Sequence, residues 1–226
     1  MMMKMRKISK IIKSKPTLEG AGVHLNRAFG SAEAPKLDPF LLLDDFRSSN
    51  PNHYLKGFPW HPHRGIETIT YMLEGSVEHG DSMGNKGVIG AGDVQWMTAG
   101  SGIIHQEMPH GDKAGYMGGF QLWANLPAAH KMMHPRYQEV KRSQIPEISP
   151  VQGVKIKIIC GEVGGIKGPV HDIVTEPEYL DVTLANDAVY THPVKPDHTV
   201  LAYIIDGRGY FDNDSYLLSN GELVWY

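Results

Sequence analysis

Short runs of apolar and β-branched residues, separated by glycine-rich turns, recur along the first 125 positions. Residues 67–73 (ETITYML), 94–97 (VQWM) and 119–123 (GFQLW) are examples. Such residues favour strands, and the turn signals at 73–75, 83–85, 90–93 and 99–102 have the spacing of an all-β barrel or sandwich. The first half therefore predicts an antiparallel β-barrel.

The strand-like pattern of apolar and β-branched residues becomes weak near residue 126 and returns only in the last third of the chain. Residues 135–150 combine charged residues and prolines with little alternation, which predicts a linker with room for a short helix. Strand-like runs resume at 154–159, 179–184, 200–205 and 216–218, and YIIDG at 203–207 is similar to YMLEG at 71–75. We therefore expect two related barrels, at 1–134 and 151–226, joined by a linker at 135–150.

Composition and charge narrow the classes of function. Charged residues make up 21% of the 226 positions and the formal charge is −3, which argues against disorder and direct nucleic-acid binding. The one cysteine, Cys160, excludes an internal disulfide, and its apolar surroundings favour a buried thiol over a nucleophile. Because no apolar run approaches the roughly 18 residues of a membrane span, we expect no membrane contact and a cytoplasmic protein, or also a nuclear one in a eukaryote.

Spacing selects four candidate metal ligands from a chain with 12 histidines. In a strand, side chains two apart point to the same face, so His61 and His63 can reach one point, and so can His105 and Glu107. Two neighbouring strands that each present such a pair would offer three imidazoles and one carboxylate. The alternative is that these residues hydrogen-bond inside a barrel without a metal, but two pairs in glycine-rich contexts favour the metal site.

This donor set limits the choice of ion. Three nitrogens and one oxygen suit Fe, Mn, Co, Ni, Cu or Zn and are poor ligands for Ca or Mg. An octahedral metal would keep two open positions, as an oxygen-activating or Lewis-acid centre requires. A four-coordinate zinc would instead be closed to substrate.

Three stretches resemble the pirin family of the cupin superfamily: residues 37–46 (LDPFLLLDDF), 61–68 (HPHRGIET) and 92–109 (GDVQWMTAGSGIIHQEMP). The resemblance implies an all-β bicupin fold, two tandem double-stranded β-helix barrels, with Fe(II) or another transition metal in the N-terminal one. It also implies the same ligands, His61, His63, His105 and Glu107. Many cupins take their carboxylate from the first motif, where Glu67 stands. The resemblance favours Glu107 instead and implies that Glu67 supports the ligands from behind or belongs to the barrel.

The second half offers His171, His192 and His198 without paired ligands, so we expect its barrel to be metal-free. The chain ends in the strand-like run GELVWY at 221–226, whereas pirin relatives continue further. We expect the second barrel to be truncated or to be completed by a partner.

The resemblance implies two alternative functions. The first is a quercetin 2,3-dioxygenase activity, in which O₂ cleaves a quercetin-type flavonol and Glu107 accepts the 3-hydroxyl proton as general base. The second is regulatory: metal- or redox-dependent binding of a transcription factor or enzyme partner, without catalysis.

Four further residues have two interpretations each. Trp60, Met97 and Phe120 are candidates to line a substrate pocket, although large apolar residues near a barrel mouth more often belong to the core. Arg64 could hold an anionic substrate or a carboxylate behind the ligands, although a solvated arginine is the default.

Overall fold

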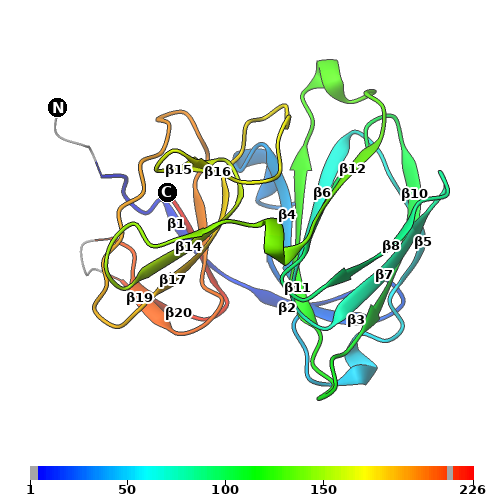
Figure 1. The fold of residues 1–226 in the computed structure, drawn as a ribbon, viewed down its shortest axis with the longest axis horizontal. Helices are drawn as coiled ribbons and strands as arrows, with labels where there is room; N and C mark the ends of the chain where they lie inside the picture. Colours follow the sequence, from blue (N-terminus) through cyan, green and yellow to red (C-terminus); the bar gives the residue numbers. More distant parts are fainter. Residues whose placement is uncertain (1–4, 213–215) are drawn as a thin grey trace.

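The computed structural model describes residues 5–212 and 216–226, and β-strands form most of its regular structure (Figure 1). The all-β prediction is confirmed. The helices in the described residues are four single 3-10 turns: η1 (Ala34–Lys36), η2 (Pro51–His53), η3 (Ala128–His130) and η4 (Arg142–Gln144). None of the described helices is long or apolar enough to cross a membrane.

Two antiparallel sheets make the first barrel. The larger has the order β12-β9-β6-β11-β4-β3-β2, and the smaller has the order β5-β10-β7-β8. The strands of the larger sheet are β12 (Arg136–Val140), β9 (Val94–Thr98), β6 (Ile66–Glu74), β11 (Gly118–Asn125), β4 (Phe40–Asp45), β3 (Val23–Phe29) and β2 (Lys15–Glu19). Those of the smaller are β5 (Phe58–His63), β10 (Ile103–His110), β7 (Ser76–Asp81) and β8 (Lys86–Gly90).

The second half contains shorter strands in four small sheets. Their orders are β1-β21-β18, β13-β14-β17, β15-β16 and β19-β20. The strands are β1 (Lys10–Lys13), β13 (Glu147–Ile148), β14 (Val154–Cys160), β15 (Glu162–Val163), β16 (Ile166–Lys167), β17 (Tyr179–Leu184), β18 (Leu201–Tyr203), β19 (Arg208–Tyr210), β20 (Leu217–Ser219) and β21 (Glu222–Trp225).

Three strands lie outside the ranges that the sequence predicts for their barrels: β1, β12 and β13, the last of which lies in the expected linker and pairs with β14. β1 pairs with β21, so it extends the second half, while β2 begins the large sheet of the first (Figure 1). β12 lies within the expected linker and pairs with β9 along its whole length. It satisfies backbone donors and acceptors at the β9 edge that would otherwise lack partners.

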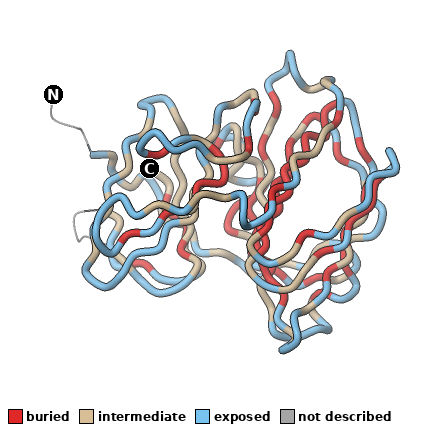
Figure 2. The backbone as a smooth tube through the Cα atoms, viewed as in Figure 1, coloured by how far each residue is buried: buried red, intermediate tan, exposed pale blue. Residues whose placement is uncertain are grey.

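The hydrophobic core continues across the junction of the two halves. Trp96 and Phe120 of the first half pack in one buried cluster with Ile159 and Leu223 of the second. Buried residues follow the strands of the first barrel and continue into this junction, whereas many residues of the second half are exposed (Figure 2). The first barrel is therefore anchored on one side, and its polar interior lies on the other face of β6, β9 and β11.

Candidate metal centre

β5 and β10 bring the three predicted histidines together. The strands are antiparallel neighbours, with His105 opposite His61 and Ile103 opposite His63. His63 and His105 are buried, while Ile104, between Ile103 and His105, is exposed. The alternation that the sequence predicts for both strands therefore directs these imidazoles to the inside of the barrel.

The imidazoles meet through their Nε2 atoms. His61 Nε2 lies 3.0 Å from His63 Nε2 and 3.0 Å from His105 Nε2. One nitrogen from each ring lies within 4.8 Å of the others. His61 Nδ1 lies 2.8 Å from the Pro59 carbonyl oxygen, which fixes its ring in the tautomer that has its proton on Nδ1.

Burial keeps two of these rings neutral. Burial, together with the positive charge that His61 would carry, lowers the pKa of His63 to about 4 and that of His105 to about 3. At neutral pH both rings therefore have a free lone pair, the form in which imidazole binds metals.

The donor set fits a divalent transition metal. The three Nε2 atoms converge, and His61, with its proton on Nδ1, presents a lone pair at the point where they meet. Three lone pairs directed at one point repel one another unless a cation lies between them. His61, His63 and His105 could therefore hold such an ion.

Glu107 shares the inward face but lies outside this group of nitrogens. It is 7% exposed, on the same side of β10 as His105, and the pairing with β5 shifts register between the two residues. Burial raises the pKa of Glu107 to about 7, and the Thr70 hydroxyl opposes part of this rise. Its carboxylate is not among the atoms that lie within 4.8 Å of one another.

Glu67 faces the other way. Its Oε1 accepts a 2.7 Å hydrogen bond from the Thr98 hydroxyl. Its neighbours on the same face of β6, Ile69 and Tyr71, belong to the core at the junction of the two halves. Because side chains alternate along β6, Glu67 points away from the barrel interior that holds the histidines.

The pocket-lining candidates differ in position. Trp60 is 55% exposed, Met97 is buried in a cluster with Ala99 and Ile103, and Phe120 packs in the junction core. Phe120 therefore belongs to the core.

Trp123 is an aromatic residue that lies beside the histidines. Its ring centroid lies 5.0 Å from that of His63, with the planes at 81°. Sequence reasoning missed Trp123, although it lies three residues beyond Phe120 and therefore on the opposite face of β11. The alternation of side chains between the two faces of β11 could have identified Trp123 as an inward-facing residue.

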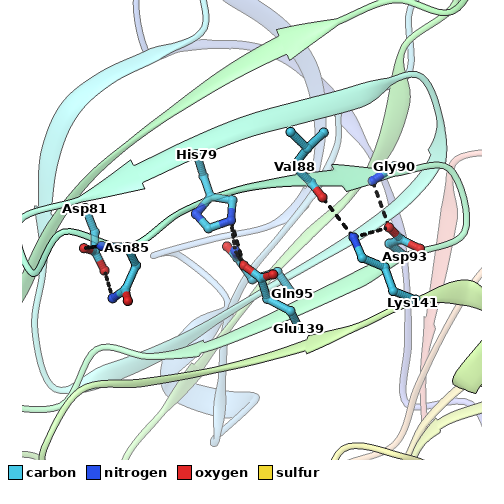
Figure 3. A network of polar contacts seen from close by, with 9 residues as sticks. All are labelled: His79, Asp81, Asn85, Val88, Gly90, Asp93, Gln95, Glu139 and Lys141. Atoms are coloured by element: carbon cyan, nitrogen blue, oxygen red, sulfur yellow. Dashed lines mark hydrogen bonds and ion pairs between the residues drawn. The ribbon is translucent and has the colours of Figure 1, made fainter.

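A third buried histidine, His79 on β7, lies inside the same barrel. Its Nε2 is 2.8 Å from Glu139 Oε1 and 2.9 Å from Gln95 Nε2 (Figure 3). The Tyr137 ring stacks on it with centroids 5.9 Å apart. Neither His79 nor Tyr137 stood out in the sequence, because their partners come from strands distant along the chain.

The remaining candidates lie away from this interior. In the second half, His192 Nε2 is 2.6 Å from Glu178 Oε2, and His171 contacts Asp172 at the surface. His198 contributes its carbonyl oxygen to Arg6. Arg64 is exposed and its Nη2 lies 3.4 Å from the sulfur of Met132.

Both the fold and the three-histidine group define a class of protein, the cupins: β-barrel proteins that hold a metal with histidines from two neighbouring strands. The Pirin family model matches residues 22–124. A pirin-like protein of Caulobacter vibrioides is 47% identical over 91% of this chain and 75% of its own length. The chain belongs to the pirin family.

Two further relatives carry the name of an activity. A Pseudomonas aeruginosa protein, provisionally named as a quercetin 2,3-dioxygenase, is 42% identical over 85% of this chain and 68% of its own length. The crystal structure of a quercetin 2,3-dioxygenase from Acinetobacter baumannii is 32% identical, with a TM-score of 0.88 over 98% of this chain and 79% of that one.

Proposed function

We propose that this protein is a metal-dependent dioxygenase that acts on quercetin-type flavonols. The observation that carries the proposal is the group of three imidazoles inside the barrel, of which burial keeps His63 and His105 neutral. The similarity to the Acinetobacter baumannii quercetin 2,3-dioxygenase supports the choice of reaction. We propose Fe(II) as the metal, with Mn, Co, Ni, Cu and Zn as alternatives.

Glu107 completes the ligand set in this proposal. It supplies the oxygen donor that the three imidazoles lack, and its position on the inward face of β10, two residues beyond His105, supports this role. When bound, the metal supplies Lewis acidity and open coordination positions for the flavonol and O₂.

The chain's own residues orient the flavonol and move one proton. A Glu107 carboxylate oxygen accepts the proton of the flavonol 3-hydroxyl as general base, which makes the ring electron-rich enough to react with O₂. Trp123, beside His63, offers a flat wall against which an aromatic ring can pack. The barrel interior excludes bulk water, which strengthens electrostatic contacts to the substrate.

Metal-loaded protein tests the proposal. With Fe(II) or Mn(II), we expect quercetin absorbance to fall in step with O₂ uptake. His63→Ala should lose both bound metal and turnover, because it removes one of three nitrogens from the group. If metal-loaded protein turns over no flavonol of a broad set, the dioxygenase assignment is wrong.

His192→Ala is the matched control. His192 is partly buried and its Nε2 contacts the Glu178 carboxylate, but it lies in the second half. We expect this variant to keep its metal and its activity. Metal loss in His192→Ala together with retention in His63→Ala would refute the site.

A further inference from the structure

A row of polar side chains crosses the inward face of the larger sheet. Thr70 on β6 is the register partner of Gln95 on β9 and of Gln121 on β11. Thr70 and Gln95 are buried, whereas the opposite face of the same three strands packs in the apolar core at the junction of the two halves. Because a buried polar side chain costs free energy unless it is hydrogen-bonded, the row is stable only where its members have partners.

Thr70 joins this row to Glu107 on the opposite sheet. Its hydroxyl hydrogen-bonds the Glu107 carboxylate, and its Oγ1 lies 2.5 Å from the side-chain oxygen of Gln121. Thr70 is only 3% exposed, and its β-branched side chain has few rotamers available. The hydroxyl is therefore held between the Gln121 amide and the Glu107 carboxylate.

The three groups can form a chain of hydrogen bonds with one direction. A hydroxyl has one proton and two lone pairs, whereas an ionised carboxylate can only accept. A half-turn of the Gln121 amide exchanges its oxygen and nitrogen, so that Nε2 donates to Thr70 Oγ1 and the hydroxyl proton is directed to Glu107. An ionised Glu107 therefore selects the direction from Gln121 through Thr70 to its own carboxylate.

This chain bears on how Glu107 binds a metal. The Glu107 carboxylate has two oxygens, and the one that accepts the Thr70 proton is a weaker donor to a cation than the other. Three imidazoles and one carboxylate oxygen fill four of the six positions of an octahedral ion and leave two open, whereas a carboxylate bound through both oxygens would leave one. The contact with Thr70 therefore favours the more open centre.

We infer that Thr70, oriented by Gln121, is a positioning residue that holds one carboxylate oxygen of Glu107 and leaves the other to bind the metal. The inference rests on the proposed function for the role of Glu107 as a ligand. Hydrogen bonds to the ligands of a metal tune its affinity, and loss of one such partner typically lowers that affinity about 10–100-fold.

Anaerobic titration of metal-free protein with Co(II) tests the positioning role. The visible absorption of bound Co(II) gives the affinity, and its shape and intensity report the number and kind of ligands. Thr70→Val removes the hydroxyl and keeps the branched shape, so we expect about tenfold weaker binding and a changed spectrum. Thr70→Ser should restore both, whereas a role in packing alone would lower the unfolding midpoint without changing the spectrum.

Thr98→Val is the matched control, because the buried Thr98 hydroxyl also donates to a buried carboxylate, that of Glu67, at 2.7 Å. This pair faces away from the histidines, so the variant should keep the affinity and spectrum of wild type. Gln121→Met should weaken Co(II) binding less than Thr70→Val, because the hydroxyl remains but loses the group that orients it. An affinity and spectrum equal to wild type in Thr70→Val would overturn the inference, as would the same result in Gln121→Met if Thr70→Val does not fold.

Glu107→Ala shows whether Thr70 acts through Glu107. In that background, Thr70→Val should cause no further loss of Co(II) affinity, and a further loss would overturn the inference. The two proposals can also fail separately. If wild type consumes quercetin and O₂ but Thr70→Val binds Co(II) as wild type does, the positioning role is wrong and the dioxygenase remains. If Thr70→Val weakens Co(II) binding but wild type consumes no flavonol, the positioning role remains and the dioxygenase is wrong.

Discussion

Replacement of Gly87 by alanine tests how rigidly the first barrel holds His79. The two residues are register partners on β8 and β7. An alanine Cβ would lie 2.6 Å from His79 Nε2 and 3.1 Å from Glu139 Oε1. The first distance is too short for a stable contact, so the imidazole must move and its contact with Glu139 must lengthen.

The expected destabilisation is about 2 kcal/mol. Overpacking of a fixed interior position costs about 1–3 kcal/mol. The His79–Glu139 contact adds about 1 kcal/mol or less, because the Glu139 side chain is 41% exposed. For a chain of this length, about 2 kcal/mol lowers the midpoint of thermal unfolding by about 4–8 °C.

Thermal unfolding followed by circular dichroism measures this change, with Gly80→Ala as control. Gly80 lies on β7, next to His79, but a Cβ there would meet only Lys86 Cγ at 3.7 Å and Asn85 O at 3.8 Å, which are ordinary contacts. A midpoint for Gly87→Ala equal to or above that of Gly80→Ala would refute the claim that His79 is locked in place.

Three further predictions concern pH, the junction of the two halves and the metal. Burial opposes ionisation of Asp93, but hydrogen bonds from Lys141 and two backbone N–H groups hold its pKa below the ordinary value (Figure 3). In pH-dependent urea unfolding, Asp93→Asn should therefore cost about 1–3 kcal/mol at pH 7, a difference that disappears as the pH falls below about 4. Asp45→Ala should destabilise by about 3–5 kcal/mol in urea, since it leaves the partly buried guanidinium of Arg47 without its carboxylate; a loss under 1 kcal/mol would contradict this. Trp123→Phe should abolish most quenching of tryptophan fluorescence by Cu(II) or Fe(II), because Trp123 lies 5.0 Å from a proposed ligand; unchanged quenching would place the metal elsewhere.

The sequence by itself determined the all-β class and the three histidines of the candidate centre. Side-chain alternation is local: it follows from the pleat of any strand, so residues two apart share a face wherever the strand lies. That is why His61 and His63 could be paired from the sequence, and why His105 and Glu107 could be assigned to one face.

Only the tertiary structure decided which strands are neighbours and what lies beside the histidines. The pairing of β1 with β21 joins residues more than 200 positions apart, and β12 reaches β9 from a segment with a weak strand pattern. Such long-range pairings also place the side chains of Trp123, His79 and Tyr137 in the interior of the first barrel. Strand register depends on the summed burial and hydrogen bonding of the whole barrel, so no short stretch of sequence specifies it.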